Sequence, residues 1–256
     1  MAEENIYLTE KTQDGSISFK NLEFNESYHS IIGAYTEALH KHVLACKIVE
    51  LAKSYDKKTI NLRNIDNNAE SSNSSEPIKI LDVCFGLGYN SGVAIEKIWE
   101  INPEQRIEII ALESDIGIIQ RILELEIPEN YQDVHKKLTS LSKLAPKMEQ
   151  GSEILKYEEE KLVITVFLDD ARNSVKSLAN NYFDAVFFDP FSPKSCPVLW
   201  TEEFIQDVVN TANTGAYIST YSSARIAKDG FANAGCELFE GPKLNRRNGG
   251  VLAKKI

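Results

Sequence analysis

The chain has 256 residues, of which 43% are hydrophobic, and its formal net charge is -10. This length and composition predict one sizeable α/β core with room for a small N-terminal appendage. No apolar run approaches the length of a transmembrane helix, and the start of the chain lacks a secretory signal, so we expect a cytoplasmic protein. The four cysteines are widely scattered without a C-x-x-C pair, which argues against a zinc site or a disulfide framework.

The first 77 residues predict an extension that packs on the core. Two short apolar runs flank the turn pair Asp14-Gly15, which predicts a β-hairpin over residues 6–20. Apolar positions at three- and four-residue spacing predict a long amphipathic helix over 27–53. Residues 56–77 are rich in Asn, Ser and Glu and predict a linker or surface insertion.

Three histidines fall within the predicted N-terminal helix: His29, His40 and His42. A metal site would need further ligands at suitable spacing, and none stands out. We therefore expect solvent-facing or packing roles for all three.

From Ile78 onward, strand and helix patterns alternate, which predicts a doubly wound sheet in a domain over residues 78–256. The expected strands lie near 78–84, 106–112, 162–168, 184–189 and 215–221, and the expected helices near 90–101, 114–147 with a break around Pro128, 171–179, 200–213 and 223–234. The strand-like segments Cys236–Glu240 and Val251–Lys255 have no helix between them. They predict a final antiparallel strand at the edge of a mostly parallel sheet.

A glycine turn follows the first predicted strand in the stretch IKILDVCFGLGYNSG, at residues 78–92. Gly86 and Gly88 would allow a ligand to lie against main-chain N–H groups at the start of the next helix. The third glycine, Gly92, comes one position later than a dinucleotide fingerprint requires, which argues against NAD. A nucleoside cofactor and a ligand-free turn both remain open for this stretch alone.

Acidic residues stand at the ends of the next three predicted strands. Glu113, 25 residues after Gly88, would accept hydrogen bonds from ribose hydroxyls. Asp170, after Asp169, would accept the exocyclic amine of adenine, and Asp189 ends the fourth strand. Each carboxylate alone could instead be a helix cap. Together they indicate a nucleoside-cofactor site at the carboxyl edge of the sheet.

The stretches LDVCFGLGYNSG, ALESD, FLDDA and DPFSPKSCPVLWTEEF resemble the methyltransferase half of the MnmC-type enzymes that modify the wobble uridine of tRNA. The glycine motif is generic, whereas the segment from Asp189 to Phe204 is specific, and the resemblance covers most of the chain. It implies a Rossmann-like, class I S-adenosylmethionine-dependent methyltransferase. The family pattern falls on Gly86, Gly88, Asn90, Asp189, Phe191, Pro193, Pro197, Trp200 and Thr201.

Two departures from that family limit what the resemblance implies. Bifunctional members carry a flavin-dependent oxidase domain for which 256 residues leave no room, so no oxidase activity is expected. Many members have glycine after the motif aspartate, where this chain has Pro190. The loop therefore also resembles the D/N-P-P-Y loop of other amine methyltransferases.

The resemblance implies methylation of the exocyclic amine of 5-aminomethyl-(2-thio)uridine in the tRNA anticodon stem-loop, with no metal required. The residues it implies for the cofactor are Asp82, Gly86, Gly88, Asn90, Glu113, Asp169, Asp170 and Asp189. Asp189 is also the expected catalytic residue, with a loop-fixing role as the alternative. Phe191 and Trp200 could stack on the flipped base, although buried packing is an equal alternative for Trp200.

The C-terminal residues 221–256 carry seven basic and three acidic residues, a local charge of +4, which leaves -14 on the rest of the chain. A polyanion could dock there, or the segment could be a solvated charged face. Under the docking hypothesis the phosphate contacts are Arg225, Lys243, Arg246 and Arg247. A pairing of Arg246 or Arg247 with Glu240 is the alternative.

Four other functions remain to be weighed. A polyamine aminopropyltransferase or a small-molecule N-methyltransferase would share the fold and the amine chemistry. A C5-pyrimidine methyltransferase would use a cysteine nucleophile, for which Cys196 lies in the right loop but is followed by Pro197. A non-enzymatic RNA-binding module would not need acids at consecutive strand ends.

Overall fold

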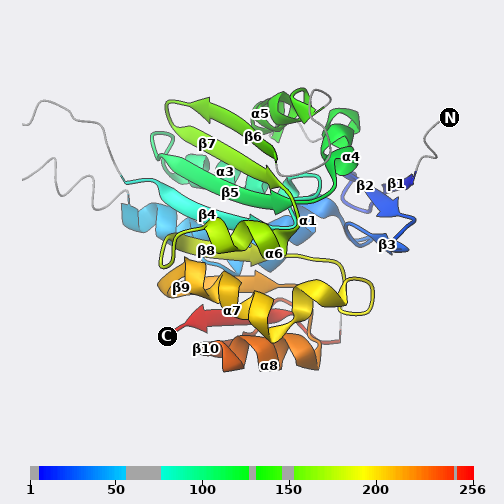
Figure 1. Ribbon diagram of the computed structural model, residues 1–256. Helices are drawn as coiled ribbons and strands as arrows, with labels where there is room; N and C mark the ends of the chain where they lie inside the picture. The colour runs from blue at the N-terminus through cyan, green and yellow to red at the C-terminus, as the bar shows by residue number, and fades with distance from the viewer. Residues whose placement is uncertain (1–5, 56–75, 127–130, 146–152, 245–246) are drawn as a thin grey trace, which may run out of the picture.

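The computed structural model describes residues 6–55, 76–126, 131–145, 153–244 and 247–256. They form an eight-stranded sheet with helices on both faces, and a separate three-stranded sheet near the N-terminus (Figure 1). The predicted α/β class with a mostly parallel sheet is confirmed. The predicted linker, apart from Glu76 and Pro77, and the predicted break at Pro128 lie outside the described residues.

The large sheet has the strand order β10-β11-β9-β8-β4-β5-β7-β6. Its parallel part consists of β4 (Ile78–Val83), β5 (Ile107–Glu113), β7 (Leu162–Leu168), β8 (Phe183–Phe188) and β9 (Ala212–Thr220). Antiparallel strands complete both sides: β6 (Glu153–Glu159) beyond β7, and β11 (Val251–Lys255) and β10 (Cys236–Glu240) beyond β9. The predicted core strands are all present, with shifts of a few residues at their ends.

Two details of the sheet differ from the sequence prediction. β11 is not at the edge, because it pairs with both β9 and β10 and so fills the gap between these two strands. The edge strand is β10. On the other side, β6 was not predicted. It pairs only with β7, and its solvated Glu and Lys side chains hide the apolar alternation that marks an inner strand.

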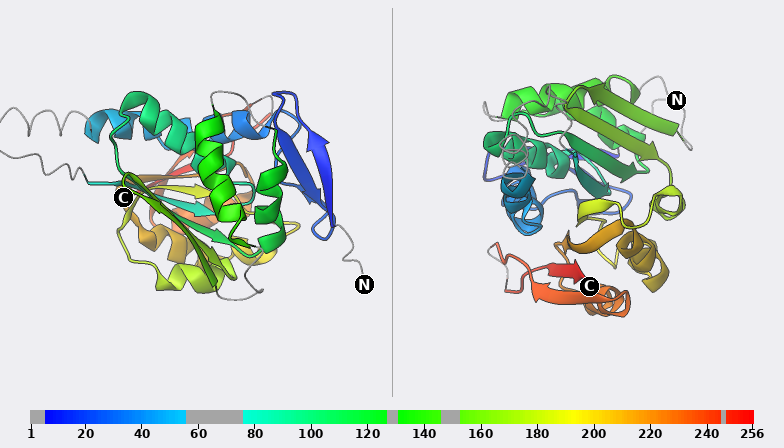
Figure 2. Two further views of the ribbon diagram at one scale, coloured as in Figure 1. Left: turned by 90° about the horizontal axis from the view of Figure 1, so that it is seen from above. Right: turned by 90° about the vertical axis from the view of Figure 1, so that its left-hand side faces the viewer.

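The helices form two layers, one on each face of the sheet (Figure 2). One layer holds η1 (Ala38–Leu44), α3 (Tyr89–Ile101) and α5 (Gln132–Ser142), and the other holds α6 (Ala171–Ser174), α7 (Glu202–Thr211) and α8 (Arg225–Asn233). Neighbouring strand residues point to opposite faces, so Ile80 joins the first core and Leu81 the second. Both layers are needed because the parallel strands are apolar on both faces.

The segment after α3 and the segment around α6 and α7 break into shorter helices than predicted. The predicted helix over 114–147 is divided into α4 (Ile116–Gln120), the 3-10 turn η2 (Arg121–Glu124) and α5. Two further 3-10 turns, η5 (Val175–Ser177) and η6 (Pro197–Trp200), follow α6 and precede α7. No helix in the described part of the chain is long and apolar enough to cross a membrane.

The N-terminal hairpin is confirmed as β1 (Tyr7–Lys11) and β2 (Ile17–Asn21), to which the short β3 (Glu26–Ser27) is added. The long helix predicted over 27–53 is wrong in its first turns. It begins only at Ala34 with α1 (Ala34–Glu37), continues as the π-helix η1, and is helical again over 48–55. Lys47 interrupts it with a positive φ of 57°, and Ile31, expected on the apolar face, is 62% exposed.

The hairpin holds the start of this helical segment in place. Asp14 accepts hydrogen bonds from the backbone N–H and the hydroxyl of Thr36, both at 2.8 Å, and Ser16 Oγ accepts one from the N–H of Ala34. The three-stranded sheet lies beside the carboxyl ends of the parallel strands (Figure 1). The N-terminal segment is thereby brought to the edge where ligands bind in open α/β sheets.

Candidate active site

A cavity of about 320 Å³ opens where the strand order reverses. The chain builds β4, β5 and β7 in one direction and then crosses to β8 and β9, so the reversal lies between β4 and β8. The cavity walls come from the turn after β4, the ends of β5 and β8, and N-terminal residues between Phe24 and His42. Such a switch point is the expected ligand site of a doubly wound sheet.

The turn between β4 and α3 depends on its glycines. Gly86 and Gly88 have φ values of 53° and 74°, which residues with a Cβ rarely adopt. A Cβ on Gly88 would also lie 2.7 Å from the Phe85 ring. Gly86 lines the cavity and Gly88 does not. Gly88 therefore shapes the turn, and Gly86 is the glycine available to a ligand.

Glu113, at the end of β5, ties the glycine turn to the neighbouring strand. Its Oε2 accepts the N–H of Gly86 at 2.8 Å, and its Oε1 accepts the N–H groups of Ser114 and Asp115, also at 2.8 Å. Burial and, secondarily, the charge of Asp115 raise the pKa of Glu113 to about 7. The side chain also lines the cavity, where a carboxylate was predicted to hold ribose hydroxyls.

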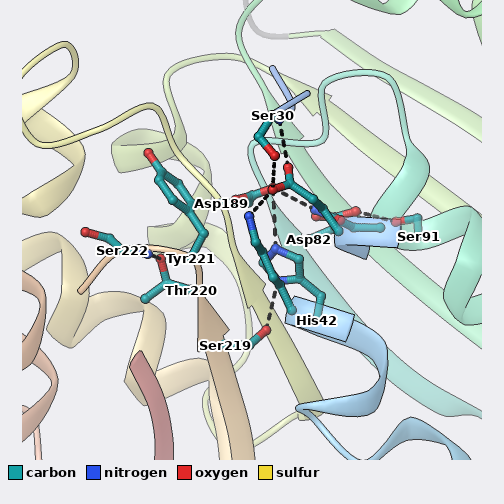
Figure 3. Close-up of polar contacts among 12 residues, drawn as sticks. Ser30, His42, Asp82, Ser91, Asp189, Ser219, Thr220, Tyr221 and Ser222 are labelled. Carbon is teal, nitrogen blue, oxygen red and sulfur yellow. Dashed lines mark hydrogen bonds and ion pairs between the residues drawn. The ribbon is translucent and has the colours of Figure 1, made fainter. Parts of the chain in front are cut away.

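Two polar residues near the start of α3 differ in their access to the cavity. Asp82 is fully buried outside the cavity wall, and its Oδ2 accepts the Ser91 hydroxyl at 2.6 Å (Figure 3). Burial raises its pKa to about 8, and its contact with Ser91 supports the helix start. Asn90 does line the cavity, and its buried Oδ1 has no partner among the described residues.

Asp189 follows β8 and lines the cavity with a side chain that is 18% exposed. Its Oδ2 lies 3.0 Å from Asn90 Nδ2 and 3.5 Å from His42 Nε2 (Figure 3). Burial raises the pKa of Asp189, but the interactions of its carboxylate with His42 and Asn90 outweigh it and hold this pKa below its usual range. Oδ1 has no hydrogen bond to the described residues. The site thus offers an ionised carboxylate oxygen to a ligand.

His42 was missed as a site residue by the sequence prediction, which gave it a solvent-facing or packing role. It is 1% exposed, lines the cavity, and its Nδ1 lies 2.9 Å from the Ser219 hydroxyl oxygen. A signal existed in the sequence, because His42 lies four residues before the buried Cys46 and so belongs to the apolar side of the segment.

The predicted adenine contact of Asp170 stays a prediction. Its carboxylate accepts the backbone N–H of Arg172 at 2.9 Å and forms an ion pair with the Arg172 guanidinium, and it does not line the cavity. Asp170 is the N-cap of α6, which was the alternative for each acid. Asp169 also lies outside the cavity wall and accepts the N–H of Asp170, so its cofactor role stays a prediction.

The two aromatic residues of the predicted base-binding loop have different positions. Phe191 lines the cavity, with its ring centroid 5.1 Å from Phe24 and 5.0 Å from Tyr28. Trp200 is completely buried, and its Nε1 donates to the Phe191 carbonyl at 2.8 Å. Direct stacking of Trp200 on a base is therefore wrong, and the packing alternative holds. Cys196 lines the cavity, but burial raises its pKa and disfavours the thiolate that a nucleophile needs.

Three of the four predicted phosphate contacts, Arg225, Lys243 and Arg247, emerge at the same sheet edge as the cavity. Val251 pairs with both Thr220 and Glu240, so residues 241–244 and 247–250 and the start of α8 lie where β9 ends. Arg225 is 93% exposed beside Asp229, and Lys243 is 57% exposed beside Glu240. Arg247 is exposed, and Arg246 lies outside the described residues.

The sequence of this chain is similar to those of known proteins. Residues 132–256 match a family described as S-adenosyl-L-methionine-dependent methyltransferases. An uncharacterized protein of Methanocaldococcus jannaschii is 24% identical and is matched over 96% of this chain and 58% of its own length. A tRNA 5-methylaminomethyl-2-thiouridine biosynthesis bifunctional protein, MnmC, of Leptospira interrogans is 22% identical over 66% of this chain and 26% of its own length. The chain thus spans little more than half of the first relative and about a quarter of the second.

The crystal structure of MnmC2 from Aquifex aeolicus has the same architecture. The two chains are 30% identical with a TM-score of 0.74, and the match covers 99% of this chain and 71% of that one. This agreement confirms the resemblance predicted from the glycine turn and the Asp189 loop. The chain belongs to the family of S-adenosylmethionine-dependent methyltransferases that includes A. aeolicus MnmC2 and the methyltransferase half of MnmC.

Proposed function

We propose that this protein methylates the exocyclic amine of 5-aminomethyl-(2-thio)uridine at the tRNA wobble position, in the cytoplasm, giving 5-methylaminomethyl-(2-thio)uridine. The observation that carries the proposal is the ionised carboxylate of Asp189 in the wall of the same cavity as the glycine turn. The relationship to MnmC2 supports a tRNA substrate. In this proposal residues 1–77 are an extension that completes the acceptor side of the methyltransferase domain, residues 78–256.

The cavity residues fit S-adenosylmethionine, which when bound supplies an electrophilic methyl group on a sulfonium. Gly86 leaves the backbone open to a close ligand, and Glu113 presents a carboxylate suited to ribose hydroxyls. The unpartnered Oδ1 of Asn90 is a buried acceptor that suits the α-ammonium group of the methionine moiety. These three residues would hold the cofactor.

Asp189 would act on the acceptor amine. An alkylammonium has no lone pair, so the site must select the neutral amine or remove a proton before nitrogen can react. Oδ1 of Asp189 can accept a hydrogen bond from the amine and so orient its lone pair. Phe191, placed against Phe24 and Tyr28, would give the flipped base an aromatic surface.

A different amine acceptor is the main alternative, because carboxylates also gather elsewhere in the cavity wall. Glu26, Glu37 and Asp115 line it together with Asp189, which would suit a polyamine or another small amine. The test is incubation with labelled S-adenosylmethionine and either aminomethyluridine-containing tRNA, putrescine or spermidine. We expect label on tRNA and the methylaminomethyl nucleoside by mass spectrometry. Label on a polyamine instead would establish the alternative.

Replacing Glu113 with alanine should weaken S-adenosylmethionine binding by about 1–3 kcal/mol, the scale of hydrogen bonds to a charged group. The change removes the predicted ribose acceptor and also the partner of the Gly86 N–H. Calorimetry would measure the affinity, and thermal unfolding would check the fold. Asp184→Asn is the matched control, since it alters a carboxylate near the start of β8 that lies outside the cavity wall, and it should bind normally. Unchanged affinity of Glu113→Ala would remove Glu113 from the cofactor site.

The double variant Arg246→Ala/Arg247→Ala should raise the apparent KM for tRNA. Each lost phosphate contact should lower the log–log slope of binding against salt by about 0.7–0.9. Cofactor affinity should not change, because Arg247 lies outside the cavity wall. Lys161→Ala is a suitable control, since Lys161 precedes β7 at the opposite sheet edge. A salt slope equal to wild type would place the tRNA surface elsewhere.

A further inference from the structure

A buried chain of polar contacts joins three elements beneath the cavity. The Ser219 hydroxyl of β9 lies 2.9 Å from His42 Nδ1, and His42 Nε2 lies 3.5 Å from Asp189 Oδ2 (Figure 3). Ser219 and His42 are each 1% exposed. The His42 ring also packs edge-to-face with Phe187 at a centroid distance of 5.6 Å, which restricts its orientation. The imidazole is therefore held at both ring nitrogens and by an aromatic neighbour.

The backbone that carries His42 is unusual. Lys41 and His42 are consecutive, yet both are buried and both line the cavity. Here the segment Ala38–Leu44 is π-helical, and π-helical turns occur frequently at functional sites.

The partners of His42 assign its proton. A carboxylate only accepts hydrogen bonds, so Asp189 requires the N–H to be on Nε2. Nδ1 then accepts the Ser219 hydroxyl, so each ring nitrogen has one partner. Asn90 Nδ2 also donates to Oδ2 of Asp189. Asn90 and His42 therefore both contact Oδ2, and Oδ1 of Asp189 is left for a ligand in the cavity.

Other titratable groups near this pair are neutral or compensated. Glu37 and Lys41, on the same helical segment as His42, form an ion pair with each other. On the N-terminal loop, His29 has a pKa lowered chiefly by burial. Near Asp189, burial raises the pKa values of Asp82 and Cys84 and so disfavours the charged form of both. His42 is thus the group through which the charge of Asp189 can be controlled.

We infer that His42 is a positioning residue for methyl transfer: held by Ser219, its Nε2–H fixes Oδ2 of Asp189 and leaves the ionised Oδ1 directed at the acceptor amine. The inference rests on the proposed function, in that the acceptor is an amine bound at Asp189. No covalent bond to His42 forms or breaks, because the residue acts only through the carboxylate.

The test compares two substitutions of similar size. His42→Leu removes the donor, and we expect kcat to fall about 10²-fold, the scale of a misplaced catalytic group, with the KM for S-adenosylmethionine unchanged. His42→Gln restores a terminal N–H donor and should recover at least tenfold. The matched control His40→Leu, on the same π-helical segment but outside the cavity wall, should have the wild-type kcat. A wild-type kcat in a folded His42→Leu variant would overturn the inference.

The pH dependence provides a readout that a purely structural role would not change. Burial raises the pKa of Asp189, and the interactions with His42 and Asn90 lower it. Removing His42 leaves the effect of burial less opposed, so the pKa of Asp189 rises and its carboxylate is protonated at a higher pH. The acid side of the kcat profile should therefore move to higher pH in His42→Leu and return in His42→Gln. A profile that stays at the wild-type position in both variants would show that His42 does not control the carboxylate.

Nitrogen-15 NMR of histidine-labelled wild-type protein separates this inference from the proposed function. The resonance that disappears in His42→Leu should show the Nε2–H tautomer, and an Nδ1–H tautomer would overturn the assignment. If wild type methylates another amine but not tRNA, and the variants respond as above, the tRNA function fails and the role of His42 stands. If wild type and His42→Leu methylate tRNA equally, the tRNA function stands and the proposed role of His42 fails.

Discussion

Replacing Asp189 with alanine is expected to lower kcat for methyl transfer about 10²- to 10⁴-fold, the usual contribution of a group that orients or deprotonates a reactant. Cofactor affinity should largely persist, because the proposed contact of Oδ1 is with the acceptor amine. The fold should persist too, since the backbone N–H of Asp189 still donates to the Val83 carbonyl. Single-turnover methylation of tRNA and calorimetry with S-adenosylmethionine would measure the two effects separately.

Asp189→Asn distinguishes charge from shape. The amide has nearly the same size but no negative charge, so the loss of rate should approach that of Asp189→Ala. Asp184→Asn is the matched control at the start of the same strand, where the carboxylate accepts the Lys79 N–H and an Asn213 amide N–H away from the cavity. It should have the wild-type rate. A rate within a few-fold of wild type in both Asp189 variants would show that Asp189 only supports its loop.

The core strands could be predicted because each is marked by a pattern within its own short stretch of sequence. Runs such as Phe183–Phe188 are apolar on both faces and bounded by polar turns, as buried parallel strands require. β6 could not be identified in this way, because an edge strand keeps one side solvated and its sequence alternates with charged residues. The positions of β10 and β11 depend on which of them pairs with β9. The sequence pattern within either strand does not determine that pairing.

The site was predictable where it follows a strand and unpredictable where it comes from a distant segment. Asp189 and Glu113 stand at strand ends, and parallel strands bring such positions together. The same rule does not settle the role of Asp170, because a carboxylate between a strand and a helix is equally an N-cap. His42 contacts Ser219 across 177 residues of sequence, and helical periodicity gives the face of a residue but not its partner.

Trp200→Ala should lower the free energy of unfolding by about 3–5 kcal/mol, the range for removing a large aromatic side chain from a core. The indole is fully buried, and its ring centroid lies 5.2 Å from that of Phe188. The change also leaves the Phe191 carbonyl without its donor. Denaturant unfolding would measure the loss, and an unchanged slope against denaturant would show that stability alone has changed.

Trp200→Phe separates packing from the hydrogen bond. Most of the apolar volume is kept, but the Phe191 carbonyl loses its partner, so we expect a smaller loss of about 1–3 kcal/mol. Because Phe191 lines the cavity, freeing its carbonyl should also raise the KM for the acceptor while the affinity for S-adenosylmethionine stays the same. A ring that stacked directly on the base would give the opposite pattern: Trp200→Ala would keep wild-type stability and lose tRNA binding, and Trp200→Phe would retain both.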